Sequence, residues 1–201
     1  MHYFYRFSWY GTRLLLHLVW GLEIVFPERL NLTESVIVAA NHLSNYDPPV
    51  VGAVLPFEIC FLAKSELFKN KLFGALIRKY NAIPIVRHTS DWKGINQVLN
   101  ILETGKSLLL FPEGTRKGKI IKPGVGMFAM KAQKNILPIW VENTDCLGKC
   151  LFRKRRLRVV IGELIKYESF QNWEQCKENY QKIADYTFQK IGELKDASST
   201  R

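Results

Sequence analysis

Short apolar runs alternate along this chain with segments whose apolar residues recur at helical spacing. An apolar run bounded by polar residues is typical of a buried strand, and a helix between two such runs is typical of parallel strands. We therefore expect an α/β fold with a mostly parallel central sheet flanked by helices. The predicted strands are residues 36–40, 60–63, 82–86, 107–111, 136–141 and 157–161, and the predicted helices are residues 70–79, 91–102, 126–134 and 173–194.

The chain has 201 residues, a length that fits one domain with a full hydrophobic core. We expect an N-terminal helical segment over residues 1–30 and the α/β domain over residues 31–201. The four cysteines form no C-x-x-C pair, and Cys146 and Cys150 lack histidines at zinc-finger spacing, so no metal site is expected. Scattered cysteines without a cleavable signal fit a reducing cytoplasm.

Residues 2–26 carry many aromatic side chains and are expected to form an amphipathic helix that ends at Pro27. Arg13 and His17 belong to a basic stripe on a helical projection, and a wide apolar face lies opposite. The charged residues leave no uninterrupted apolar run of about 18 residues, so a membrane-spanning helix is not expected. This pattern is typical of a helix that lies in the membrane interface. The alternative is a helix packed on the core of its own domain.

The charge balance predicts an anionic partner. Lys and Arg number 29 against 18 Asp and Glu, a formal net charge of +11. A nucleic-acid binder is disfavoured, because the aromatic residues gather in the N-terminal segment and no helix-turn-helix or RNA-binding signature is visible. The densest basic cluster, residues 153–158, is expected either to bind anionic lipid or an acidic acyl-carrier protein or to keep an edge strand from pairing.

Polar residues follow the first predicted strand in the stretch from Asn41 to Pro49. Four residues separate His42 from Asp47, so a turn must bring their side chains together. Asp47 could then fix the imidazole tautomer while His42 accepts a proton. No G-x-S-x-G motif supplies a protein nucleophile, so the pair would most simply activate a hydroxyl of the substrate. The alternative is a capping histidine beside a turn aspartate.

Two further groups of polar residues also follow predicted strands. Arg87 comes after the run 82–86, and residues 113–116 come after the run 107–111. Because parallel strands end at one edge of a sheet, the loops that carry His42, Arg87 and Glu113 can face one cleft. The alternatives are a surface arginine at position 87 and a solvated basic turn around Arg116.

Taken together, residues 41–47, 82–87 and 111–116 resemble the motifs of the glycerolipid acyltransferases, specifically the bacterial 1-acylglycerol-3-phosphate acyltransferases. Residues 137–139 resemble a fourth motif of the family, and Lys122 begins a segment that resembles the one that follows the third motif. The second motif usually opens with glycine, whereas Asn81 stands there in this chain. Asparagine tolerates the left-handed backbone conformation better than most residues, so the turn can survive.

The resemblance implies acyl transfer from a thioester to the sn-2 hydroxyl of 1-acylglycerol-3-phosphate (lysophosphatidic acid), which makes phosphatidic acid. His42 would be the general base and Asp47 its orienting partner. Arg87 and Arg116 would bind the phosphate of the acceptor, because a guanidinium matches phosphate geometry. The other residues expected to bind the acceptor or support the site are Glu113, Gly114, Thr115, Asn41 and Lys122.

The resemblance also implies the partners of the chain. The acyl donor would be an acyl-carrier protein thioester or a coenzyme A thioester, with no bound cofactor. The protein would be peripheral or monotopic on the cytoplasmic face of the cell membrane, in contact with an anionic lipid surface. The alternatives are an acyltransferase for glycerol-3-phosphate or another lyso-lipid, and a non-catalytic anionic lipid-binding relative, against which the intact His42–Asp47 pair counts.

Overall fold

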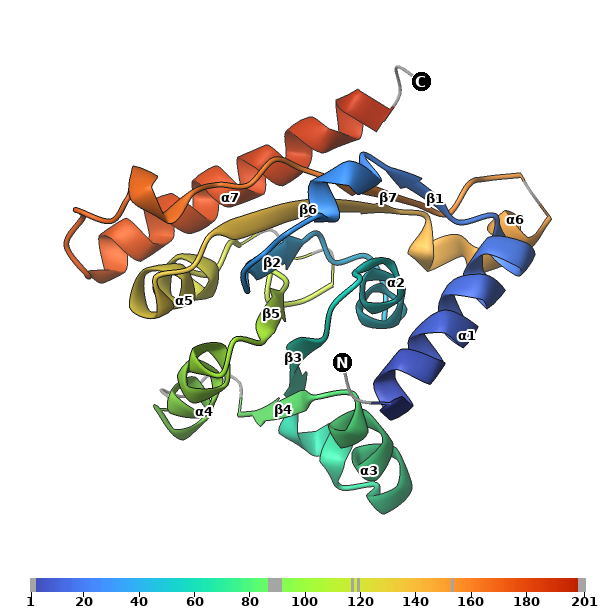
Figure 1. Ribbon diagram of the computed structural model, residues 1–201, viewed down its shortest axis with the longest axis horizontal. Helices are drawn as coiled ribbons and strands as arrows, with labels where there is room; N and C mark the ends of the chain where they lie inside the picture. Colours follow the sequence, from blue (N-terminus) through green and yellow to red (C-terminus); the bar gives the residue numbers. More distant parts are fainter. Residues whose placement is uncertain (1–2, 87–91, 117, 119, 153, 199–201) are drawn as a thin grey trace.

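The computed structural model describes residues 3–86, 92–116, 118, 120–152 and 154–198. Within these residues the strands form one seven-stranded sheet in the order β1-β7-β6-β2-β5-β3-β4 (Figure 1). The strands are β1 (Glu23–Val25), β2 (Ile37–Ala40), β3 (Ile59–Lys64), β4 (Ala82–Ile85), β5 (Ser107–Leu110), β6 (Ile136–Glu142) and β7 (Arg158–Ile161). Among the described strands only the β6–β7 pair is antiparallel, so the expected mostly parallel sheet is confirmed.

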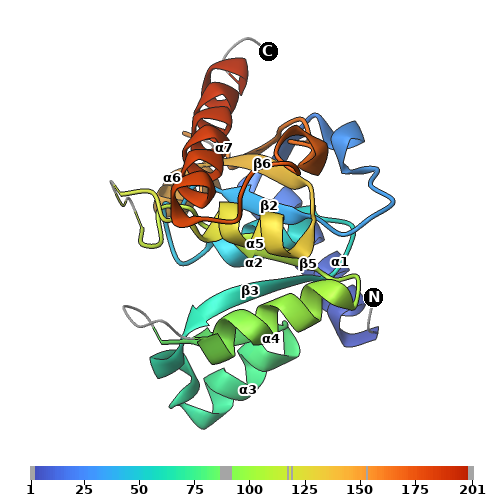
Figure 2. The ribbon, with the colours of Figure 1, turned by 90° about the vertical axis from the view of Figure 1, so that its left-hand side faces the viewer.

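Helices cover both faces of the sheet (Figures 1 and 2). The α-helices are α1 (Tyr3–Trp20), α2 (Asp47–Val54), α3 (Lys71–Lys79), α4 (Trp92–Glu103), α5 (Gly124–Ala132), α6 (Leu147–Leu151) and α7 (Lys177–Ser198). The short 3-10 helices are η1 (Pro27–Leu30), η2 (Ser65–Phe68), η3 (Thr144–Cys146) and η4 (Tyr167–Ser169). Residues of α1, α2 and α6 share one core, and residues of α4, α5 and α7 share the core on the opposite face.

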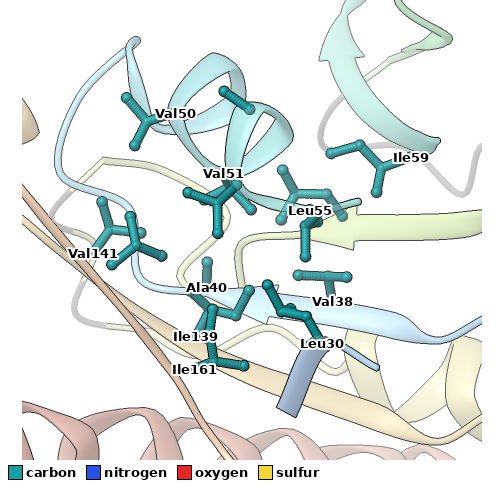
Figure 3. Packing of buried hydrophobic residues seen from close by; sticks show 14 of the residues in the cluster. Leu30, Val38, Ala40, Val50, Val51, Leu55, Ile59, Ile139, Val141 and Ile161 are labelled. Carbon is teal, nitrogen blue, oxygen red and sulfur yellow. The ribbon is translucent and has the colours of Figure 1, made fainter. Parts of the chain in front are cut away.

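Strand β2 explains why the central strands read as continuous apolar runs. Val38 and Ala40 face the core that contains α2, and Ile37 and Ala39 face the core that contains α5. Figure 3 shows the first of these cores, in which Val51 of α2 lies over β2. Because side chains alternate along a strand and both faces are covered, each residue of β2 is buried.

The N-terminal segment differs from the prediction in two respects. The helix ends at Trp20 rather than near Pro27, because Gly21 adopts a left-handed conformation (φ 61°) and its N–H donates to the carbonyl of His17. Residues 23–25 then form β1, which pairs in parallel with β7. The expectation of one helix over residues 2–26 is therefore wrong, and part of the 1–30 segment belongs to the sheet.

Two other features of the helices bear on the predictions. The last helix begins at Lys177 rather than Trp173. Residues 171–176 are not helical, and the N–H of Trp173 donates to the carbonyl of Phe170 in a turn. Among the described residues, no helix combines the length and the apolarity that a bilayer-spanning segment requires.

Candidate active site

Three neighbouring parallel strands, β6, β2 and β5, end at the same edge of the sheet. His42 follows β2, Glu113 follows β5, and Thr144 follows β6. The side chain of Glu113 contacts the backbone of His42, so the loops after β2 and β5 converge as expected. Arg87, the third expected contributor, lies outside the described residues.

His42 and Asp47 form a direct contact across the turn between β2 and α2. Nδ1 of His42 lies 2.7 Å from Oδ2 of Asp47, and the Asp47 side chain is fully buried. Pro48 and Pro49 follow in the first turn of α2, where proline is tolerated because the first N–H groups of a helix have no partner within it. The prolines therefore fix the start of α2 directly after Asp47.

The carboxylate of Asp47 is held from several directions. Its Oδ2 also accepts hydrogen bonds from the backbone N–H groups of Leu43 and Ser44, at 2.7 and 2.8 Å. Its Oδ1 accepts hydrogen bonds from the hydroxyl of Ser44 at 3.4 Å and from the buried hydroxyl of Thr144. A buried carboxylate needs such donors, and these donors fix the side chain that orients His42.

The contact with a carboxylate favours one tautomer of the neutral imidazole. With the Nδ1–H of His42 donating to Asp47, the lone pair of the neutral ring lies on Nε2. The ring also stacks on Phe111, with centroids 4.2 Å apart and planes at 20°. The orientation of the ring is thus set by a carboxylate and by an aromatic face, and the site can accept a proton at Nε2.

Glu113 lies behind His42 rather than in solvent. Its Oε1 accepts a hydrogen bond of 3.2 Å from the backbone N–H of His42, and its side chain is buried. Oε2 is also buried and has no hydrogen-bond partner among the described residues. Burial raises the pKa of the Glu113 carboxyl, although the hydrogen bond from His42 opposes the shift. Glu113 therefore positions the backbone of the turn that carries His42.

The rest of the loop after β5 is more open. Gly114 adopts a left-handed conformation (φ 66°), and a Cβ at this position would lie 3.1 Å from Cγ of Lys122. The N–H of Lys122 donates to the carbonyl of Pro112 at 2.8 Å, which closes the loop. Thr115 and Arg116 are exposed. The loop therefore presents a guanidinium and backbone groups near the edge that carries His42.

Asn41 connects β2 to β6. Its side-chain amide donates to the carbonyl of Val141 at 3.0 Å and accepts from the N–H of Val141 at 2.7 Å. Asn41 is buried, and its side-chain hydrogen bonds link β2 to β6 just beyond the last backbone pair of the two strands, next to His42. Asn81 has φ 62°, the left-handed conformation that the sequence allowed at this position.

Thr144 and Phe111 were not predicted as site residues. A signal for Thr144 was present, because it follows the predicted strand 136–141 and parallel strands end at one edge. Among the described residues, no group of three or more His, Cys, Asp or Glu side chains could hold a metal ion.

The chain is similar in sequence to known acyltransferases. The family model described as "Acyltransferase" matches residues 21–142. A 1-acyl-sn-glycerol-3-phosphate acyltransferase from Bacillus subtilis (strain 168) is 27% identical over 195 residues, which cover 96% of this chain and 97% of the relative. A lyso-ornithine lipid O-acyltransferase from Pseudomonas aeruginosa is 40% identical over 83 residues, which cover 41% of this chain and 31% of the relative.

A solved structure shares the fold. The 1-acyl-sn-glycerophosphate (LPA) acyltransferase PlsC from Thermotoga maritima superimposes with a TM-score of 0.72 at 20% sequence identity. The match covers 98% of this chain and 82% of that chain. The α/β architecture, including the N-terminal helix, is therefore one already seen in a solved protein.

Proposed function

The chain belongs to the acyltransferase family, whose model matches residues 21–142, and we propose that it transfers a fatty acyl group from a thioester to the sn-2 hydroxyl of 1-acylglycerol-3-phosphate. The observation that carries the proposal is the His42–Asp47 pair, whose 2.7 Å contact joins Nδ1 to a carboxylate and so favours the tautomer with its lone pair on Nε2. The B. subtilis relative, which the chain matches over almost its whole length, supports the choice of acceptor. The product would be phosphatidic acid.

In the proposed reaction, Nε2 of His42 accepts the proton of the acceptor hydroxyl. The hydroxyl oxygen bonds to the thioester carbonyl carbon, the carbon–sulfur bond breaks, and the proton on Nε2 passes to the departing thiolate. Asp47 stabilises the imidazolium that forms between these two steps. Because the acceptor supplies the nucleophile, the reaction needs no serine or cysteine of the protein.

We assign acceptor binding to the loop after β5 and to Arg87. Arg116 and Arg87 would bind the phosphate through charge-assisted hydrogen bonds. Gly114 and Thr115 would contact the glycerol phosphate, and Glu113 and Lys122 would hold the shape of the loop. The exposure of Arg116 next to the buried Glu113 supports this division of roles.

The proposed donor is an acyl-carrier protein thioester or a coenzyme A thioester. We propose that the chain works as a peripheral or monotopic protein on the cytoplasmic face of the cell membrane. Helix α1 supports membrane contact, because its outward stripe contains Tyr3, Phe7, Leu14 and Leu18, all largely exposed. Arg13 does not belong to that outer face, since its guanidinium contacts the carbonyl of Val54 and the ring of Trp9.

A second acceptor class is favoured by one observation. The lyso-ornithine lipid O-acyltransferase from P. aeruginosa is 40% identical over its aligned residues, against 27% for the B. subtilis relative, although it aligns over less than half of this chain. An acceptor of that class would use the same base, and a cationic loop would matter less for an acceptor without a glycerol phosphate. The two acceptors can therefore be separated by the requirement for Arg116.

The test is thiol release from a long-chain acyl thioester by the purified chain in detergent. Lysophosphatidic acid, glycerol-3-phosphate and a lyso-ornithine lipid are compared as acceptors, with His42→Ala alongside and a thermal melt to show that the variant folds. We expect release that depends on lysophosphatidic acid and falls about 10²–10⁴-fold in His42→Ala. Near-normal turnover in His42→Ala would refute the general base, and no release with any acceptor would indicate a non-catalytic lipid binder.

A further inference from the structure

Helix α3 exposes the apolar side that a surface helix normally buries. Leu72 is 86% exposed, and Phe73 and Leu76 are each 46% exposed. The residues that face the protein are Gly74 and Ile77. A surface helix usually directs its apolar stripe at the core, so this orientation requires an explanation.

The packing of α3 shows why it cannot simply rotate. Ile77 packs against Ala63 and Ala82 on strands β3 and β4. A Cβ on Gly74 would lie 3.0 Å from the backbone of Phe68, so the helix sits close to η2 through its one glycine. The close approach fixes which face points outward, and that face carries the leucines.

The exposed apolar stripe of α3 continues onto α1. Leu72, Leu76 and Tyr80 follow one another at i,i+4 spacing, so they line one side of α3 and its C-cap. The ring of Tyr80 lies 5.5 Å from Phe4 and 6.2 Å from Tyr5, both on α1. The apolar surfaces of the two helices therefore meet at Tyr80.

Both helices also lie on the same face of the sheet. Phe61 of β3 packs against the core beneath α1 and α2 and also against the small cluster beneath α3. Figure 1 shows α3 near the N-terminal end of α1. A single flat surface could therefore contact both helices.

Basic side chains surround the exposed stripe of α3. Lys79 lies over the ring of Phe4, 5.3 Å from its centroid, and Arg78 lies over the ring of Phe68, 4.7 Å from its centroid. Residues 64–79 contain one carboxylate, Glu66, and five exposed basic residues, Lys64, Lys69, Lys71, Arg78 and Lys79. Cations beside exposed leucine and phenylalanine match the surface of an anionic bilayer.

We propose that α3 is a second bilayer-contacting element, which inserts Leu72, Phe73 and Leu76 into an anionic lipid surface beside α1. The proposal rests on the proposed function, because a membrane lipid as acceptor is what places the protein at a bilayer. Two contacts on one rigid body restrict its orientation on the membrane more than one helix can. The edge that carries His42 would thereby be held at a constant height above the lipid.

The test measures vesicle binding with substitutions on different faces of the full chain. Leu72→Glu changes α3, Phe7→Glu changes α1, and Tyr186→Glu places the same charge at a half-exposed position of α7 on the opposite face of the sheet. Binding is measured by sedimentation with vesicles of mixed phosphatidylcholine and phosphatidylglycerol. Turnover in detergent micelles is measured for each variant, and light scattering gives its mass.

We expect Leu72→Glu to weaken vesicle binding about tenfold and Tyr186→Glu to leave it within about twofold. Turnover of Leu72→Glu in detergent should equal that of the unmodified chain. Unchanged vesicle binding by Leu72→Glu would overturn the proposal. If the mass of this variant also differed from that of the unmodified chain, the exposed face of α3 would be a contact between two copies of the chain. If the unmodified chain shows no turnover in detergent, the proposed reaction fails, while the vesicle measurement still decides the role of α3.

Discussion

The turn that carries His42 and the loop that carries Arg116 lie at one edge of the sheet, but their side chains are held very differently. Asp47 is fully buried and accepts hydrogen bonds from His42, Leu43, Ser44 and Thr144. Arg116, by contrast, is exposed. The fold itself therefore sets the geometry of the first region, whereas in the proposed function the bound acceptor would order the second.

The difference has an energetic meaning. A preorganised base loses no conformational freedom when the acceptor binds, so its contribution belongs to the chemical step. An exposed arginine loses side-chain entropy on binding and is compensated by charge-assisted hydrogen bonds to an anion. Substitutions in the turn should therefore change kcat, and substitutions in the loop should change the acceptor KM.

The largest effect outside the base itself is expected at Arg116. Arg116→Ala should raise the KM for lysophosphatidic acid about 10–100-fold, because a hydrogen bond to a charged group contributes ~1.5–3 kcal/mol. The melting temperature should stay the same, since the side chain is exposed. Steady-state thiol release at varied acceptor concentration measures both constants.

Arg116→Lys is the matched control, because it keeps the charge but loses the planar guanidinium. Its KM for lysophosphatidic acid should lie between those of the unmodified chain and Arg116→Ala. A fall in kcat at constant KM would contradict the division between the two regions. An acceptor without phosphate should show no dependence on Arg116.

A smaller effect is expected at Thr144, which supports the turn from β6. Thr144→Val keeps the shape of the side chain but removes the hydroxyl that donates to Asp47. We expect kcat to fall about tenfold with little change in KM, and the free energy of unfolding to fall by ~1–3 kcal/mol. Thr144→Ser should restore most of the turnover.

Thr187 offers a matched control for Thr144. It is also a buried threonine, and its hydroxyl donates to the carbonyl of Ile183 on α7, in the core on the opposite face of the sheet. Thr187→Val should lower stability without changing kcat. Equal losses of kcat in both variants would mean that Thr144 acts only on the stability of the fold.

The same contrast explains what the sequence could predict. Local signals were enough for six of the seven described strands and for the turn, because apolar runs and the short His42–Asp47 spacing act over a few residues. Thr144 was missed because its partner is far along the chain and only the parallel β2–β6 pairing brings them together. Contacts of this kind follow from the order of the strands, which periodicity does not give.

The N-terminal segment was misjudged for a different reason. Pro27 predicts the end of the helix, whereas the glycine at position 21 ends it through its left-handed backbone. Ile24 and Val25 of β1 continue the apolar pattern of the preceding helix in the sequence, so only their pairing with β7 identifies them as a strand. The exposed face of α3 was likewise hidden, since helical spacing shows an apolar stripe but not the direction in which it points.

The smallest expected effect concerns Glu113, which belongs to the loop in sequence but to the turn in its contacts. Burial raises its pKa above the ordinary value of 4.5, so the folded protein binds a proton on this carboxyl more readily than the unfolded chain. The contribution of Glu113 to stability therefore falls as pH rises from about 4.5 through the raised pKa, and its ionised carboxylate opposes folding at neutral pH. Glu113→Gln removes this charge and can still accept the hydrogen bond from His42 N–H.

The melting temperature of the variant should therefore rise relative to that of the unmodified chain as pH rises, by about 2–4 °C for each kcal/mol of difference in the free energy of unfolding. Calorimetry from pH 4 to 8 measures it, and a difference that does not change with pH would mean that the carboxyl of Glu113 does not titrate as its burial requires.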